Sequence, residues 1–147
     1  MNSERYGIKI WSVRTLLENQ DKLTYHVPEY QRAYEWKEDQ VDELWNDITN
    51  AINEKAEDYL MGAVILRKMS GYPKKRDIVD GQQRITTLTS LLGVIRNNYE
   101  DIGEKALADD IQKLIIKGKS GNFSYTLELS ISDRTNQQYL KDIIDTP

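Results

Sequence analysis

The spacing of apolar side chains predicts short strands interleaved with helices. Apolar and polar residues alternate over residues 6–11, 23–27 and 125–129, and this period of two is typical of strands. Residues 59–66 and 77–79 are apolar runs of strand length, separated by a polar, turn-rich segment. This arrangement favours two strands joined by a turn.

Between these strands, apolar residues recur every three or four positions, which is typical of amphipathic helices. Ser12 can cap the first helix, Ser132 or Asp133 can cap the last, and the helix over residues 106–115 is expected to end near Gly118. The apolar positions of the helices are Val13, Leu16, Leu17, Val41, Leu44, Trp45, Ile48, Ile52, Ile85, Leu88, Leu91, Leu92, Ile95, Tyr99, Ala106, Leu107, Ile111, Leu114, Ile115, Tyr139, Leu140 and Ile143. Because strands and helices are interleaved, the class is mixed α/β or α+β.

The composition limits the kind of protein that this pattern describes. The chain has 147 residues, a formal net charge of −4, one histidine and no cysteine. The length suits one domain over residues 1–147, and the absence of cysteine excludes disulfides and thiolate metal sites. A single histidine excludes any site that needs two imidazoles from one chain. The sequence has no apolar run of the roughly 18 residues that span a membrane, so we expect a cytoplasmic protein with no membrane partner.

Asp80, Gly81, Gln82, Gln83 and Arg84 interrupt the apolar pattern between a short strand and a helix. Gly81 tolerates a positive φ and lets a ligand approach the backbone, while the first N–H groups of the following helix favour an anion. Arg84 suits phosphate oxygens, Gln82 or Gln83 can orient a water, and Asp80 can hold Mg²⁺ through one oxygen. The motif therefore predicts a phosphate-binding and catalytic site. A structural alternative stays open, in which Asp80 caps the helix and Arg84 pairs with a carboxylate.

The loop over residues 30–36 is a second candidate site. It is rich in aromatic residues, whereas loops usually carry small polar ones. Aromatic faces can stack on a base, and Arg32 can reach a phosphate or stack on a ring. The candidate nucleotide-binding residues of this loop are Tyr30, Gln31, Arg32, Tyr34 and Trp36. In the alternative, the aromatic side chains close the edge of the core.

Charge is segregated along the chain, so the net charge of −4 is an average. Residues 35–58 carry nine acidic residues against two lysines, whereas residues 67–76 carry five basic residues and no acidic one. Lys74, Lys75 and Arg76 are therefore candidate DNA contacts. The alternative is that they are solvated surface residues.

The order of these motifs resembles the N-terminal domain of GmrSD-type modification-dependent restriction endonucleases, within the ParB/sulfiredoxin-like superfamily. The Tyr-Gln-Arg-x-Tyr-x-Trp element of that family, preceded by Pro, is matched by residues 28–36, with Ala33 where Pro is common. The family's apolar strand with a central Gly is matched by residues 60–66, and its signature Asp-Gly-Gln-Gln-Arg by residues 80–84. The resemblance covers residues 8–144 and implies an α+β fold with a small mixed sheet flanked by helices.

The resemblance also implies a regulatory domain of a type IV-like restriction or anti-phage system. Such a domain would bind and hydrolyse a nucleoside triphosphate with Mg²⁺, using residues 80–84 for catalysis and residues 30–36 for nucleotide binding, and this step would control DNA cleavage elsewhere. The expected partners are the triphosphate, modified DNA and a His-Asn-His nuclease domain, and a homo-oligomer stays open. With one histidine the chain cannot contain that nuclease domain, so residues 1–147 are expected to be the N-terminal part of a longer protein.

Two other functions stay open at this point. The domain can be a non-hydrolysing module that senses DNA or contacts a partner protein and so gates a partner nuclease. Direct nuclease activity is the other, although metal nucleases usually assemble more carboxylates than Asp80 alone.

Overall fold

The structure is a computed structural model that describes residues 7–19, 22–119 and 122–145. Within these residues a four-stranded sheet has the order β2-β3-β1-β6. Its strands are β1 (Thr24–His26), β2 (Ile65–Met69), β3 (Tyr72–Asp80) and β6 (Leu127–Glu128). β1 lies parallel to β3 and β6, whereas β2 lies antiparallel to β3. A separate antiparallel hairpin consists of β4 (Ile116–Lys119) and β5 (Asn122–Tyr125).

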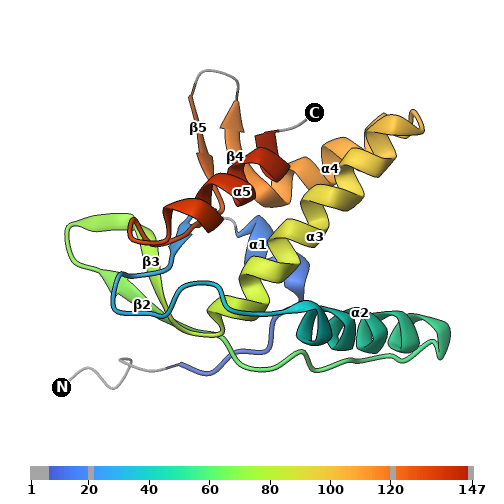
Figure 1. The fold of residues 1–147 in the computed structure, drawn as a ribbon, viewed down its shortest axis with the longest axis horizontal. Coiled ribbons are helices and arrows are strands. Elements are labelled where there is room, and N and C mark those ends of the chain that lie inside the picture. The colour runs from blue at the N-terminus through green and yellow to red at the C-terminus, as the bar shows by residue number, and fades with distance from the viewer. Residues whose placement is uncertain (1–6, 20–21, 120–121, 146–147) are drawn as a thin grey trace.

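Helices flank the sheet (Figure 1). They are α1 (Val13–Glu18), α2 (Glu38–Asn53), α3 (Gln82–Asp101), α4 (Lys105–Ile115) and α5 (Arg134–Asp145). α3 runs diagonally through the molecule and contacts α4 and α5, whereas α2 extends away from the sheet. Among the described helices, none combines the length and the apolar composition needed to cross a membrane.

The two faces of the sheet carry different side chains. Tyr25, Ile78 and Leu127 are fully buried on one face and join the core formed with α1, α3, α4 and α5. The register pairs His26 with Asp77 and Asp77 with Arg67, and these residues lie on the other face. An antiparallel edge commonly has one packed face and one polar face, and here the polar face is close to the candidate site.

The expected α+β class, a small mixed sheet flanked by helices, is confirmed. The predicted helices are also present, and Ser12 caps α1 by accepting the N–H of Thr15 at 3.1 Å. The prediction that the fourth helix ends near Gly118 is wrong, because β4 begins directly after Ile115 and includes that glycine.

Three strand predictions are wrong in detail. Residues 7–11 form no strand, because no described strand lies beside them, and residue 6 lies outside the described residues. Residues 59–64 form a loop in which Gly62 has a φ of 117°, so β2 begins only after it. The alternating run over residues 125–129 is divided between β5 and β6.

Candidate functional site

The link between β3 and α3 leaves the N-terminus of a long helix open. β3 ends at Asp80, Gly81 has a φ of 94°, and α3 begins at Gln82. A Cβ on Gly81 would lie 3.0 Å from the Ala63 carbonyl oxygen and 3.1 Å from Val64 Cγ2, so both conformation and space require glycine. No described side chain caps α3, and the Asp80 carboxylate instead accepts the N–H of Gly81 at 2.9 Å. The amides of the first turn therefore stay available to an anion.

Arg84 adds a cation to this first turn. Its guanidinium lies against the backbone of Gly62, where a Cβ would be only 2.5 Å from Nη1 and 2.9 Å from Cζ. Arg84 has no ion pair within the described residues. The structural alternative, in which Arg84 pairs with a carboxylate, is therefore not formed. The half-buried guanidinium is held by contact with Gly62 and keeps its charge available for a ligand.

The neighbourhood of Arg84 includes a phenol and an acidic helix. The Tyr59 hydroxyl donates to Asp47 Oδ2 on α2 at 2.8 Å. This hydrogen bond is the main cause that raises the pKa of Tyr59, and the positive charge of Arg84 acts in the opposite direction. Asp47 thus already accepts a hydrogen bond from the neutral Tyr59 hydroxyl, and Arg84 is close enough to Tyr59 to act on its charge.

Residues 30–36, the aromatic loop, are fastened to α3 by Gln83. Gln83 Oε1 accepts the N–H groups of Glu35 at 2.9 Å and Trp36 at 3.3 Å, and Nε2 donates to the Ala33 carbonyl at 3.1 Å. Both ends of the Gln83 amide are therefore engaged in holding the loop. The Gln82 side chain makes no hydrogen bond within the described residues, so it is the amide of the motif that is available to a water.

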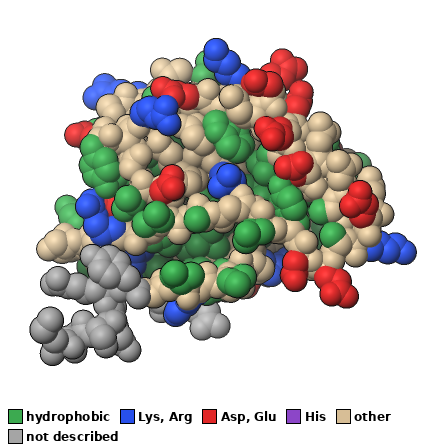
Figure 2. Space-filling model, turned by 90° about the horizontal axis from the view of Figure 1, so that it is seen from below, with side chains coloured by type: hydrophobic (Ala, Val, Ile, Leu, Met, Phe, Trp, Pro, Cys, Tyr) green, Lys and Arg blue, Asp and Glu red, His purple; other side chains and the backbone are tan. Residues whose placement is uncertain are grey.

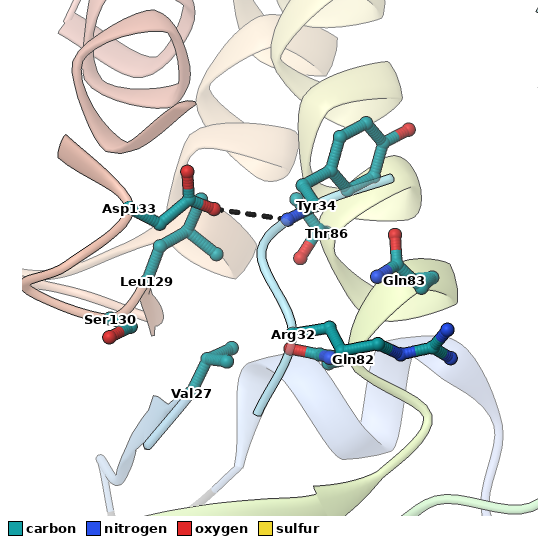
Figure 3. A pocket seen from close by; sticks show the side chains of 9 residues that line it. All are labelled: Val27, Arg32, Tyr34, Gln82, Gln83, Thr86, Leu129, Ser130 and Asp133. Atoms are coloured by element: carbon teal, nitrogen blue, oxygen red, sulfur yellow. Dashed lines mark hydrogen bonds between the residues drawn. The ribbon is translucent and has the colours of Figure 1, made fainter. Parts of the chain in front are cut away.

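Three further hydrogen bonds join the aromatic loop to its surroundings. The Tyr34 N–H donates to Asp133 Oδ2 at 3.0 Å, directly before α5 (Figure 3). The Tyr34 hydroxyl is 2.8 Å from Thr87 Oγ1 on α3, and Gln31 Nε2 donates to the Val79 carbonyl on β3 at 2.8 Å. The loop therefore lies on β3, α3 and the approach to α5 at once, and Trp36 is half-buried within it.

A small cavity lies between the aromatic loop and α3 (Figure 3). Arg32, Tyr34, Gln82 and Asp133 are among the residues that line it, and its free volume is about 10 Å³, roughly the room of one water molecule. A nucleotide does not fit inside, so a triphosphate would lie over the surface next to it. Arg32 is exposed on this surface and forms an ion pair with Glu35 at 3.3 Å.

Tyr30 is held from the polar face of the sheet. Arg67 Nη2 donates to the Tyr30 hydroxyl at 3.0 Å and to Asp77 Oδ2 at 2.9 Å, and its guanidinium lies 5.7 Å from the centroid of the Tyr30 ring. His26 Nδ1 is 3.1 Å from Asp77 Oδ1. Burial raises the pKa of Asp77, but the hydrogen bonds from Arg67 and His26 outweigh it and hold that pKa below its usual value. A buried, charged carboxylate thus fixes the arginine that holds Tyr30.

The candidate DNA contacts lie apart from this site. Lys74, Lys75 and Arg76 belong to the first half of β3, about 13–20 Å before Asp80 at the rise per residue of a strand. Lys75 forms an ion pair with Glu128 at 3.0 Å, and Arg76 Nη1 donates to two backbone carbonyls. The structure therefore brings the aromatic loop to residues 80–84 but leaves the basic residues elsewhere.

Asp80 is the carboxylate that could hold a metal here. The described residues contain no group of three or more His, Cys, Asp or Glu side chains that could bind a metal ion. Mg²⁺ keeps several waters and is commonly held by one or two carboxylates together with substrate phosphates. The exposed Asp80 carboxylate suits an ion that arrives with a triphosphate.

The sequence did not indicate four residues that organise the site. Arg67 and Asp77 face each other in the β2–β3 register, which is visible only once the position of the turn is known. The sequence predicts a helix cap for Asp133 and a strand position for Gly62, and neither prediction indicates a contact with the candidate site. Their roles follow from contacts between segments that are distant in the sequence.

Comparison with known proteins identifies a family. The sequence model of the family described as GmrSD restriction endonuclease, N-terminal domain, matches residues 13–146. A comparison with curated proteins found no match for the chain.

Proposed function

Because the chain belongs to the GmrSD restriction endonuclease N-terminal domain family, we propose that it binds and hydrolyses a nucleoside triphosphate and so controls DNA cleavage by a nuclease domain of a restriction system. The observation that carries the proposal is the combination of a helix N-terminus that no described side chain caps with Arg84, which has no ion pair among the described residues. Aligned backbone N–H groups and a fixed guanidinium are both suited to phosphate oxygens.

In the proposed reaction the protein acts by positioning and by charge neutralisation. Gly81 and the N–H groups that follow it hold phosphate oxygens, and Arg84 stabilises the charge on the transferred phosphoryl group. Gln82 orients the attacking water. Asp80 would hold Mg²⁺, which when bound neutralises phosphate charge.

The aromatic loop would bind the rest of the nucleotide. Arg32 is exposed beside Gln82 and supplies a second cation. Tyr30 and Trp36 offer ring faces to the base or the sugar. Gln83 and Asp133 act as positioning residues, because they hold the loop backbone.

A ligand screen with a matched arginine control tests this proposal. The melting midpoint is measured with each of four common triphosphates and Mg²⁺, together with phosphate release, for the wild type, Arg84→Ala and Arg14→Ala. Arg14 is an exposed arginine on α1 that pairs with Asp110 at 3.5 Å. We expect the wild type and Arg14→Ala to be stabilised by one triphosphate and to release phosphate, and Arg84→Ala to lose about 100-fold in turnover. Absence of any shift and any turnover in the wild type would refute the proposal, as would wild-type turnover in Arg84→Ala.

A non-hydrolysing DNA-sensing module is the second candidate, favoured by the five basic residues over residues 67–76. Binding to modified duplex should then weaken steeply with salt, and the double change Lys74→Ala and Lys75→Ala should reduce the slope. The matched change Lys105→Ala and Lys113→Ala on α4 should leave the slope unaltered. Equal slopes for both double variants would reject this surface as the DNA contact.

A further inference from the structure

The chain carries a large apolar groove that no described residue fills. It lies between α2, α3 and the segment that joins α2 to β2, and its free volume is about 430 Å³. Its lining is almost wholly apolar and includes Ile48, Ile52, Tyr59, Met61, Leu91 and Ile95. Hydrophobic side chains gather on the face of the molecule shown in Figure 2. An exposed apolar surface of this kind is typical of an interaction site.

The groove has an acidic border. Residues 35–58, which include all of α2, carry nine acidic residues and two lysines. Asp47 on this helix directly precedes the lining residue Ile48 and accepts the hydroxyl of Tyr59. Acidic side chains gather in the right-hand part of Figure 2, where α2 lies in Figure 1. Along its α2 edge the groove therefore favours an occupant that is apolar and positively charged, whereas Arg84 supplies a positive charge near Tyr59.

Residues 7–12, which we call the arm, have this chemistry. Ile8 and Ile10 are fully exposed, and no described strand pairs with the arm. Lys9 Nζ lies 5.8 Å from the centroid of the Trp11 ring, so the cation and the aromatic ring share one edge while the isoleucines alternate with them. The sequence thus encodes a strand with an apolar face, and the described part of the chain supplies no partner for it.

The C-terminal end of the arm lies next to the groove, and the rest of the arm leads away from it. Val13, the first residue after the arm, lines the groove, yet the arm runs away from α2 in Figure 1. A second copy, related by a two-fold axis near Val13, would bring its own arm towards the groove of the first. Both contacts then form together, so the entropic cost of association is incurred once for two arms.

We propose that the chain forms a symmetric dimer in which the arm of each copy docks into the groove of the other. Ile8 and Ile10 would enter the apolar groove, and Lys9 would face the acidic border. The contact is isologous, as in most homodimers.

Disulfide trapping between two variants tests which chain supplies the arm. The chain has no cysteine, so an Ile10→Cys chain can be mixed with a size-tagged Ile52→Cys chain under mild oxidation. Ile102→Cys is the matched control, because Ile102 is as exposed as Ile52 (71% against 68%) but lies at the far end of α3. We expect the Ile10–Ile52 pair to form the disulfide at least about tenfold faster than the Ile10–Ile102 pair, because docking raises the effective concentration of the thiols. Equal rates would overturn the proposal.

Two further measurements complete the test. A chain that carries both Ile10→Cys and Ile52→Cys should form disulfides between copies, and closure within one chain at high dilution would instead show that the arm fills its own groove. Sedimentation equilibrium should show a dimer for the wild type and for Ile102→Ser, and a monomer for Ile8→Ser with Ile10→Ser. Neither isoleucine is buried in the single chain, so these changes should leave its fold intact. A wild type that is monomeric at every concentration, or a double variant that still dimerises, would overturn the proposal.

Discussion

Gly62→Ala should disable triphosphate hydrolysis by displacing Arg84. The added methyl carbon would lie 2.5 Å from Nη1, 2.9 Å from Cζ and 3.1 Å from Nη2, whereas ordinary van der Waals contact begins at 3.4 Å. The guanidinium must therefore move by about 1 Å, and misplacement of this size can cost about 100-fold in rate. That loss corresponds to about 2.7 kcal/mol of transition-state stabilisation. The φ of 117° at Gly62 adds a cost of about 1–3 kcal/mol in the free energy of unfolding.

Gly71→Ala separates the two effects. Gly71, in the turn between β2 and β3, has a φ of 78°, and no atom lies within 4 Å of an added Cβ, so alanine there carries the strain without displacing Arg84. Phosphate release with Mg²⁺ is measured for both variants and for the wild type, and urea denaturation confirms that each is folded in the assay. We expect a loss of turnover only in Gly62→Ala. Equal turnover in the two variants would refute the argument that the contact with Gly62 positions Arg84.

Three further changes test how the site and the core are held. Gln83→Ala removes the hydrogen bonds to the aromatic loop and should lower the free energy of unfolding by about 1–3 kcal/mol. Amide exchange over residues 33–36 should become faster, and unchanged exchange there would contradict the positioning role of Gln83. The lowered pKa of Asp77 means that its charge stabilises the fold above the ordinary carboxyl pKa, and that this contribution is lost as the pH falls through the lowered value. Asp77→Asn should therefore make the free energy of unfolding fall less steeply as the pH is lowered. Identical pH profiles for the variant and the wild type would contradict this prediction. Arg96, 3% exposed, donates to two carbonyls at the end of α5, so Arg96→Leu should cost about 1–3 kcal/mol for each carbonyl left unpaired; a smaller loss in urea denaturation would show that water replaces it.

The helices were predictable because their signals are local. Apolar residues recur every three or four positions over α2, α3 and α4, and this spacing defines the apolar face of a helix from that helix's own sequence. Gly81 marks the start of α3, because its positive φ suits glycine. Strands depend on a neighbour. Residues 7–11 have the alternation of a strand without a described partner, and residues 59–64 have the composition of one without its conformation, because Gly62 has a positive φ.

The candidate site also combines local features, which the sequence shows, with contacts between distant segments, which it does not. The sequence located residues 80–84 and the aromatic loop, since each motif is contiguous. It could not find the contact of Arg84 with Gly62, nor that of Tyr30 with Arg67, because these pairs are set by the position of the β2–β3 turn and by the path of the loop before it. It also left Gln82 and Gln83 equivalent, and only the hydrogen bonds of Gln83 to the loop distinguish them.

Residues 59–64 connect the two surfaces proposed above. Tyr59 and Met61 line the groove, whereas Gly62 contacts Arg84 and Val64 contacts Gly81. An arm docked in the groove and a triphosphate at α3 would therefore act on one short segment. We therefore expect a conformational restraint imposed on this segment from one surface to change binding at the other.

Coupling between two sites is reciprocal. Because each dimer would bind two triphosphates, a given factor by which dimerisation changes the triphosphate affinity of each copy must change the dimer association constant at saturating triphosphate by the square of that factor. We expect this factor to be about 5 or more. The first value comes from nucleotide titrations of the wild type and of the monomeric variant with Ile8→Ser and Ile10→Ser, with Ile102→Ser as the exposed control. The second comes from sedimentation equilibrium of the wild type with and without a non-hydrolysable triphosphate. If the titrations coincide and the dimer affinity does not change, residues 59–64 transmit nothing between the groove and the site, and the two surfaces act independently.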